Sequence, residues 1–233
     1  MTPIATQLSE MLKLISNNCN SNKKKIVTEG ESASALIHAW LIYLKENKTT
    51  GVADSLLDGT ISAVREAICC TSLGLVRPAI NSLRLQLDLA LAWIYFKDHM
   101  IEWERVQRSG EGFKLKAELI KYLGDNDERF GARFGLLKQV VSRRLEDPYR
   151  ILSAHIHGQS EFVLPKISSP TDIVASTEAQ DELLQLQTEV SEYINDLFMS
   201  IYADQWISLP DAIRTALISR FKTPEQKANF FKH

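Results

Sequence analysis

The sequence predicts an all-α protein, and three observations lead to this prediction. Apolar residues recur three and four positions apart through most of the 233 residues, which is the spacing of helices that bury one face. No stretch shows the strict alternation of apolar and polar residues that is typical of a half-buried strand. The chain also has no internal repeat of the kind that builds solenoids. We therefore expect a helical bundle with additional helices at both ends.

The first half of the chain is expected to hold four helices, over residues 4–16, 31–45, 54–73 and 78–105. The Asn- and Lys-rich stretch 17–25 lacks apolar periodicity, so we expect a connector there. Gly74 ends the third helix, and Pro78 suits the first turn of the fourth. That fourth helix is the longest and is apolar on nearly all sides, which predicts a central position in the bundle.

The second half is expected to hold six helices, over residues 113–122, 128–145, 147–158, 177–202, 211–221 and 224–231. Gly110 and Gly112 interrupt the helical pattern before the first of them. Residues 161–176 are rich in Ser and Pro and are expected to form a surface loop. Thr177 and the acidic residues that follow it are typical of a helix start. Trp206, Phe230 and Phe231 could pack on the body of the protein or on a second subunit.

We divide the chain into an N-terminal helix and connector (1–25), a helical core (26–203) and a C-terminal helical extension (204–233). The formal net charge is −2, from 27 basic and 29 acidic residues, so any attraction for nucleic acid must come from a local patch. Six basic residues against three acidic ones between residues 133 and 166 could form such a patch.

We expect a cytoplasmic protein that does not cross a membrane. The longest uncharged run, residues 32–44, is shorter than the roughly 20 apolar residues that a spanning helix needs. The N-terminus shows no basic-then-apolar signal pattern. The three cysteines, Cys19, Cys69 and Cys70, fit neither a disulfide framework nor a zinc spacing and are expected to be buried free thiols.

The stretch from Asp147 to Gly158 is the best candidate for a functional site. Asp147 is placed to cap a helix that Pro148 opens and Gly158 ends. In such a helix Arg150, Ser153, Ala154 and His157 share one face, while His155 points about 140° away from Arg150. As a strand, the segment would instead put His155 and His157 on one face without Arg150. We favour the helix.

A second group of polar residues lies in the apolar helix that begins at Pro78. Arg84 and Asp88 are four residues apart and can pair, either to stabilise the bundle or to orient the groups around residue 150.

The chain resembles the HEPN superfamily, whose all-helical members carry the motif Arg-x(4–6)-His near the start of a late helix. Arg150 fits this motif with four residues before His155 or six before His157, and the helical face favours His157. The resemblance covers about residues 30–202. Arg84 and Asp88 resemble the polar positions behind that motif, with Tyr149 as a further supporting residue. The chain departs from the pattern at Ile151, where active members usually carry a polar residue.

The resemblance implies a metal-independent endoribonuclease of a toxin–antitoxin or anti-phage defence system that acts as a homodimer. Histidine can take the 2′-hydroxyl proton and protonate the leaving oxygen, and Arg150 can stabilise charge on the phosphate. Ser153 could bind the phosphate or fix a histidine tautomer. RNA is the expected substrate, a protein from the same operon is a possible partner, and no cofactor or metal is required.

Three alternatives remain open. A HEPN-like module without catalysis could act as an adaptor, sensor or antitoxin partner. A metal site could combine His155 and His157 with Asp147 or Glu161. The motif could also be structural, with Arg150 paired to Glu146 or Asp147, His155 in the core, His157 at a helix end and Tyr149 in packing.

Overall fold

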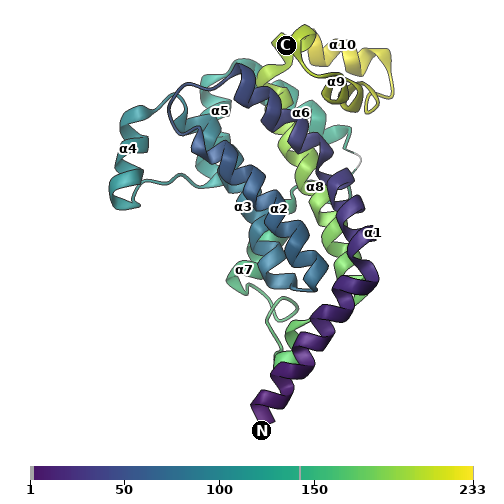
Figure 1. The fold of residues 1–233 in the computed structure, drawn as a ribbon. Coiled ribbons are helices and arrows are strands. Elements are labelled where there is room, and N and C mark those ends of the chain that lie inside the picture. The colour runs from purple at the N-terminus through teal and green to yellow at the C-terminus, as the bar shows by residue number, and fades with distance from the viewer. Residues whose placement is uncertain (1–2, 142, 233) are drawn as a thin grey trace. The chain divides into compact units, whose positions relative to one another are not determined.

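The structure is a computed structural model that describes residues 3–141 and 143–232, and these residues form an all-α fold, as predicted (Figure 1). The elements are α1 (Pro3–Asn47), α2 (Ser55–Leu73), α3 (Val76–Phe96), α4 (Met100–Ser109), α5 (Lys116–Asn126), α6 (Glu128–Gln139), α7 (Pro148–His157), η1 (Pro170–Ile173), α8 (Thr177–Tyr202), η2 (Ala203–Ser208), α9 (Asp211–Ile218) and α10 (Pro224–Lys232). Extended pairing within the two described ranges is confined to one isolated bridge, between Leu75 and Val174. No described helix is both long and apolar enough to span a lipid bilayer.

The expected connector at residues 17–25 is wrong, because α1 continues through it as helix. The stretch holds no proline or glycine, so nothing in its backbone chemistry stops a helix. Its polar side chains also find partners near the start of α8. Asn18 donates to the carbonyl of Ala175 at 3.4 Å, and Asn22 donates to the side chains of Thr177 at 3.4 Å and Gln180 at 3.2 Å.

The single helix expected over residues 78–105 is also wrong, because α3 ends at Phe96 and α4 begins at Met100. The intervening turn is closed by backbone hydrogen bonds from Asp98 to Tyr95 at 3.3 Å and from His99 to Phe96 at 3.0 Å. Neither glycine nor proline marks this break. The boundaries of α2 and α8 agree closely with the prediction, whereas α6 ends six residues earlier than expected, at Gln139.

The chain divides into two compact units, and α1, α2, α3 and α8 contribute residues to both. Unit 1 contains the chain up to Ser34, Ser62–Gln86 and Asp147–Val190. Unit 2 contains Ala35–Ile61, Leu87–Glu146 and the chain from Ser191 onward. The three-part division expected from the sequence stays a prediction.

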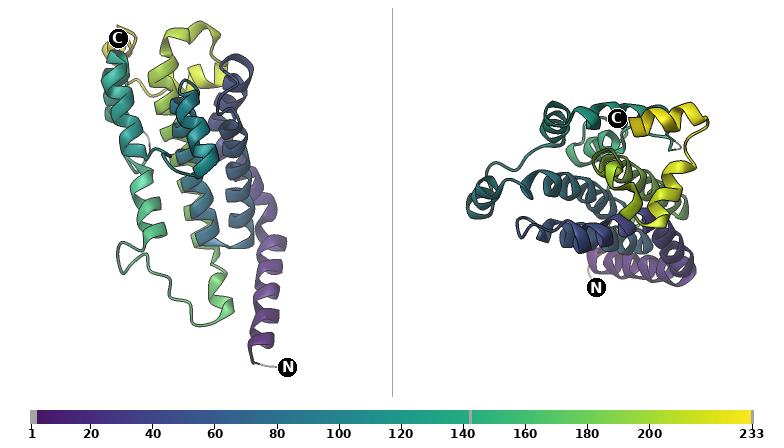
Figure 2. Two further views of the ribbon diagram at one scale, coloured as in Figure 1. Left: turned by 90° about the vertical axis from the view of Figure 1, so that its left-hand side faces the viewer. Right: turned by 90° about the horizontal axis from the view of Figure 1, so that it is seen from above.

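Unit 1 contains α7 and the long loop that returns the chain from α7 to α8 (Figure 2). Its buried apolar residues include Ile26, Val64, Ala67, Ile80, Leu83, Leu152, Leu183 and Val190. Gln86 and Gln187 are buried among them and exchange side-chain hydrogen bonds of 2.9 and 2.8 Å. Because each amide satisfies the other, these polar groups avoid the cost of burial and fix how α3 pairs with α8.

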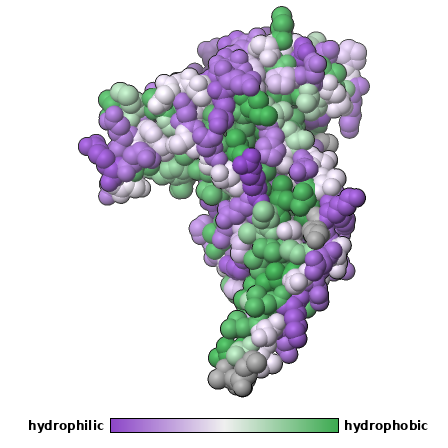
Figure 3. Space-filling view, in the orientation of Figure 1, coloured by the Kyte–Doolittle hydropathy of each residue, from purple (hydrophilic) through white to green (hydrophobic). Residues whose placement is uncertain are grey.

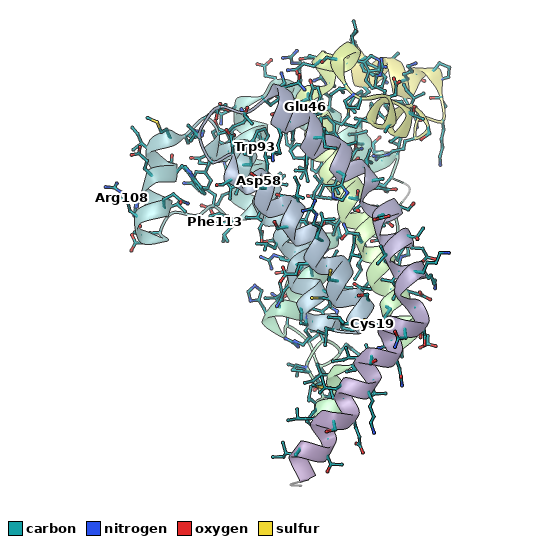
Figure 4. All side chains as sticks on the ribbon, viewed as in Figure 1. Cys19, Glu46, Asp58, Trp93, Arg108 and Phe113 are labelled. Carbon is teal, nitrogen blue, oxygen red and sulfur yellow. The ribbon has the colours of Figure 1, made fainter. Side chains whose placement is uncertain are left out.

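Unit 2 contains the larger aromatic core, whose fully buried members include Trp40, Trp93, Phe96, Phe198 and Phe230. Trp40 donates to Asn195 at 2.8 Å, which satisfies its indole N–H inside the core. In contrast, α4 has no buried residue, and Figure 4 shows Arg108 on α4 away from Trp93.

The aromatic residues at the C-terminus pack within unit 2. Phe230 is fully buried, and the ring of Phe231 meets that of Trp206 edge-on, with centroids 4.9 Å apart. The sequence left open whether these aromatic residues pack on the body of the protein or on a second subunit. In the structure they pack on the body.

Candidate functional site

Helix α7 has the limits that its local sequence predicts. The Asp147 side chain accepts a hydrogen bond from the backbone N–H of Tyr149 at 3.1 Å, and Pro148 occupies the first turn. Gly158 ends the helix in the left-handed conformation, with φ of 58°. A side chain larger than hydrogen would be strained in this conformation, which explains why a glycine ends the helix.

The predicted stripe of Arg150, Ser153 and His157 lies on the outward side of α7. Pro148 and Leu152 are the buried residues of this helix, whereas Arg150 and His157 are exposed and Ser153 is half-buried. Across the part of the chain that the structure describes, none of these three side chains forms a hydrogen bond or an ion pair. Arg150 therefore does not pair with the capping Asp147.

His155 has different surroundings from His157, although both belong to the last turn of α7. Its ring is half-buried, and Arg77 of α3 donates from Nη2 to the backbone carbonyl of His155 at 3.3 Å. Burial, and second the charge of Arg77, lower the pKa of His155 below its ordinary value of 6.5. His155 thus sits at the contact between α7 and α3, and His157 faces solvent.

The supporting residues Arg84 and Tyr149 contact each other. The Arg84 guanidinium lies 4.0 Å from the centre of the Tyr149 ring and donates to its hydroxyl oxygen. This contact combines a cation–π interaction with a hydrogen bond and joins α3 to α7. Asp88 belongs to the part of α3 in unit 2, and its expected pairing with Arg84 stays a prediction.

The basic patch expected between residues 133 and 166 is wrong for its buried members. Arg133 is buried and contacts Asp204 at 2.5 Å. Arg143 is buried and contacts Asp196 at 2.7 Å. Lys138 lies 3.6 Å from Glu146. Their charges stabilise unit 2 and are not all presented to solvent.

A metal site built on His155 and His157 gains no support from the geometry. No group of three or more His, Cys, Asp and Glu side chains that could hold a metal ion occurs among the described residues. The two rings lie on different sides of α7, as expected for residues two apart in a helix.

The three cysteines are free, but the expectation that all are buried is wrong, because Cys69 is exposed. Cys19, labelled in Figure 4 on α1, lies 3.9 Å from the carbonyl oxygen of Ser72 through its Sγ atom. Burial raises the pKa of the Cys70 thiol, which disfavours the reactive thiolate.

A cluster of titratable side chains in unit 2 escaped the sequence analysis. The rings of Tyr95 and His99 stack with centroids 4.0 Å apart, and the Tyr95 hydroxyl donates to Glu102 at 2.8 Å. Burial and this bond raise the pKa of Tyr95 to about 12. The same bond lowers the pKa of Glu102, which also contacts Lys114 at 3.3 Å. These contacts hold α4 and the segment before α5 against α3.

Arg77 also belongs to the surroundings of α7, although of the polar residues at this helical spacing only Arg84 and Asp88 were expected there. The available signal was its spacing, seven residues before Arg84, which puts both arginines on the same side of α3.

Comparison of the chain with protein-family models, with curated proteins and with solved structures gives no match. The function must therefore be argued from the residues of α7 and their neighbours.

Proposed function

We propose that the protein is a metal-independent endoribonuclease that uses the outward face of α7. The observation that carries this proposal is the exposure of Arg150 and His157 on one face, with Ser153 between them and no partner for any of the three side chains in the residues described. A guanidinium and an imidazole available to solvent are the groups that phosphate binding and proton transfer require.

The chemistry needs no metal. Neutral His157 accepts the proton of a ribose 2′-hydroxyl, whose oxygen then attacks the adjacent phosphorus. The bond between phosphorus and the 5′-oxygen breaks, and that oxygen takes the proton back from the imidazolium. Arg150 stabilises the charge that develops on the non-bridging oxygens. The products are a 2′,3′-cyclic phosphate and a free 5′-hydroxyl.

A single copy of α7 keeps these two groups far apart. Seven residues of helix separate them by about 10 Å along the axis, and both side chains tilt toward the N-terminus, so the tilt does not shorten this separation. Both groups must come within about 3 Å of the reacting phosphodiester. We therefore propose that the working site combines Arg150 of one copy with the partner's His157.

The sequence of α7 suits such a pairing. Positions 150 and 157 are equally distant from a point between Ser153 and Ala154. In two antiparallel copies of α7 related by a twofold axis at that point, each Arg150 faces the partner's His157. The two central residues are small, so the helices can approach closely. The pairing produces two identical sites, and it agrees with the homodimer implied by the HEPN resemblance.

A second function is a HEPN-like binding module without catalysis. Ile151, which is exposed next to Arg150, favours it, because active HEPN members usually carry a polar residue there. Two hollows lie away from α7 and could hold a ligand of such a module: one lies between α1 and α8, and the other is lined by η2, α9 and Ser219.

RNA cleavage in EDTA tests the proposal. Total RNA and a structured RNA are incubated with wild type and with Arg150→Ala, His157→Ala, His155→Ala and Arg65→Ala. Arg65 is an exposed arginine of α2 in the same unit and controls for the loss of a positive charge. Thermal melts first establish that all variants are folded.

We expect Arg150→Ala and His157→Ala to lose about 100-fold or more of the cleavage rate, as for the loss of a group that stabilises the transition-state charge and of one that transfers the proton. His155→Ala and Arg65→Ala should retain most of it. If folded wild-type protein cleaves no RNA under these conditions, the nuclease proposal is wrong and the binding module is favoured. Equal losses in all four variants would instead contradict the assignment of the site to the face of Arg150 and His157.

A further inference from the structure

A second arginine, Arg77, lies beside the C-terminal end of α7, which is the end that carries His157. It belongs to α3, and its side chain reaches the carbonyl of His155 in the last turn of α7. Helix ends leave such carbonyls without partners inside the helix, so this hydrogen bond satisfies one of them. A helix-capping role alone would account for this one contact.

The Arg77 side chain has capacity beyond that role. A guanidinium carries five N–H donors, and the hydrogen bond to His155 uses one of them. Arg77 is exposed, so its other donors can reach a solvent-borne ligand. Because the contact with α7 already orients the side chain, binding a phosphate there costs less conformational entropy than it would for a freely rotating arginine.

The local charge also favours an anion. The segment of α3 in unit 1, Val76–Gln86, contains Arg77 and Arg84 and no acidic residue, and α7 contains Arg150, two histidines and no acidic residue. Among the acidic residues of the segments on either side of α7, Asp147 caps the other end of the helix, Asp172 accepts from the backbone of Ser168 and Ser169, and Glu161 is exposed.

We infer that Arg77 is a second phosphate-binding residue of the α7 site, which holds a backbone phosphate next to the one that is cleaved. This inference rests on the proposed function and adds to it that the substrate is recognised through at least two consecutive phosphates of a single strand. In the two-copy site Arg77 belongs to the copy that supplies His157, and the partner's Arg150 faces that His157, so the site holds two arginines for two neighbouring phosphates.

Binding of a short single-stranded 2′-O-methyl RNA, which lacks the attacking hydroxyl, tests the inference separately from cleavage. Fluorescence anisotropy is measured over a salt series for wild type, Arg77→Gln, Arg77→Lys and Arg65→Gln. Glutamine has no charge and is two atoms shorter than arginine, so Arg77→Gln removes the capping contact as well, and the salt slope, which counts phosphate contacts, separates phosphate binding from capping. Arg65→Gln makes the same change of charge on α2 of unit 1.

We expect Arg77→Gln to weaken binding about tenfold, in line with the loss of a hydrogen bond to a charged group. The slope of log affinity against log salt should fall by about 0.7, the value for one phosphate contact on a single strand. Arg77→Lys should keep the wild-type slope, and Arg65→Gln should match wild type in both quantities.

Three outcomes would overturn the inference. Arg77→Gln could bind with the affinity and salt slope of wild type, or it could change no more than Arg65→Gln does. Wild type could also fail to bind the RNA, which removes the proposed function as well. If wild type binds but does not cleave matched unmodified RNA, the nuclease is wrong, and Arg77 is still judged by the binding series.

Discussion

Burial separates the two histidines of α7 more clearly than the sequence does. Two residues apart, they are equally good matches to a loosely spaced Arg-His motif, and only the helical geometry favours His157 as the partner of Arg150. The structure agrees with that geometry: His157 and Arg150 are exposed, and His155 is half-buried beside Arg77. Position on a helix therefore distinguishes residues that motif spacing leaves equivalent.

The surroundings of His155 predict a dependence of stability on pH. Its pKa in the folded protein lies below the ordinary 6.5, so the unfolded chain takes up this proton more readily than the folded one. The stability that neutral His155 contributes is complete above 6.5 and is lost as the pH falls through the lowered value. Urea unfolding at about pH 7.5 and about pH 5.5 should show a smaller loss of unfolding free energy for His155→Gln than for wild type.

Arg77→Gln provides the matched comparison for this effect. It removes the second cause of the lowered pKa and keeps burial, so its change should have the same direction as that of His155→Gln and be smaller. An identical loss of stability in wild type and His155→Gln would show that this histidine does not contribute to the pH dependence.

At the scale of elements, local sequence signals predicted where a helix begins or ends when a capping residue or a sharp apolar boundary was present. Asp147, Pro148 and Gly158 predicted both ends of α7, and Thr177 predicted the start of α8. The predictions of helix boundaries failed where tertiary contacts decide whether a segment is helical. The polar stretch 17–25 is helical because its asparagines meet residues near α8, and α3 ends at Phe96 without a breaking residue.

The early end of α6 has a long-range explanation of the same kind. Asp196 of α8 is fully buried between two arginines, Arg143 from the segment after α6 and Arg220 from the segment after α9. Arg143 also donates to the carbonyls of Leu145 at 2.8 Å and Glu146 at 2.9 Å, which holds this non-helical segment in place. A single sequence cannot reveal a triad whose members are 53 and 24 residues apart.

We expect Asp196→Asn to lower the free energy of unfolding by about 3–5 kcal/mol, because it leaves two arginines buried without their carboxylate. The matched control is Asp211→Asn on α9, whose side chain is 89% exposed beside Arg214 and should cost less than about 1 kcal/mol. Urea denaturation measures both. Similar small losses in the two variants would mean that the buried triad does not anchor these segments.

At the scale of the whole molecule, composition and periodicity predicted the all-α class, and local caps predicted the helix that carries the candidate site. They did not predict the division into two units, because four helices contribute residues to both units and the division does not follow the order of the chain. They also missed Arg77, since its role depends on α3 meeting α7 in space.

Apolar side chains are also exposed in unit 1. Figure 3 shows apolar surface beside the first turns of α1, where Ile4, Leu8 and Leu12 are exposed. On the loop after α7, Phe162 is 97% exposed. Exposed apolar residues are common on monomers, so these residues do not by themselves mark an interface.

The proposed catalytic site takes Arg150 from one copy and His157 from another. Mixing the Arg150→Ala and His157→Ala variants tests it most directly, because each variant alone lacks one group in every site. A mixed dimer contains one site with both groups intact, so random pairing should restore about a quarter of wild-type cleavage in EDTA. If wild type cleaves RNA but the mixture remains as inactive as its components, both groups act within one chain and the two-copy site is wrong.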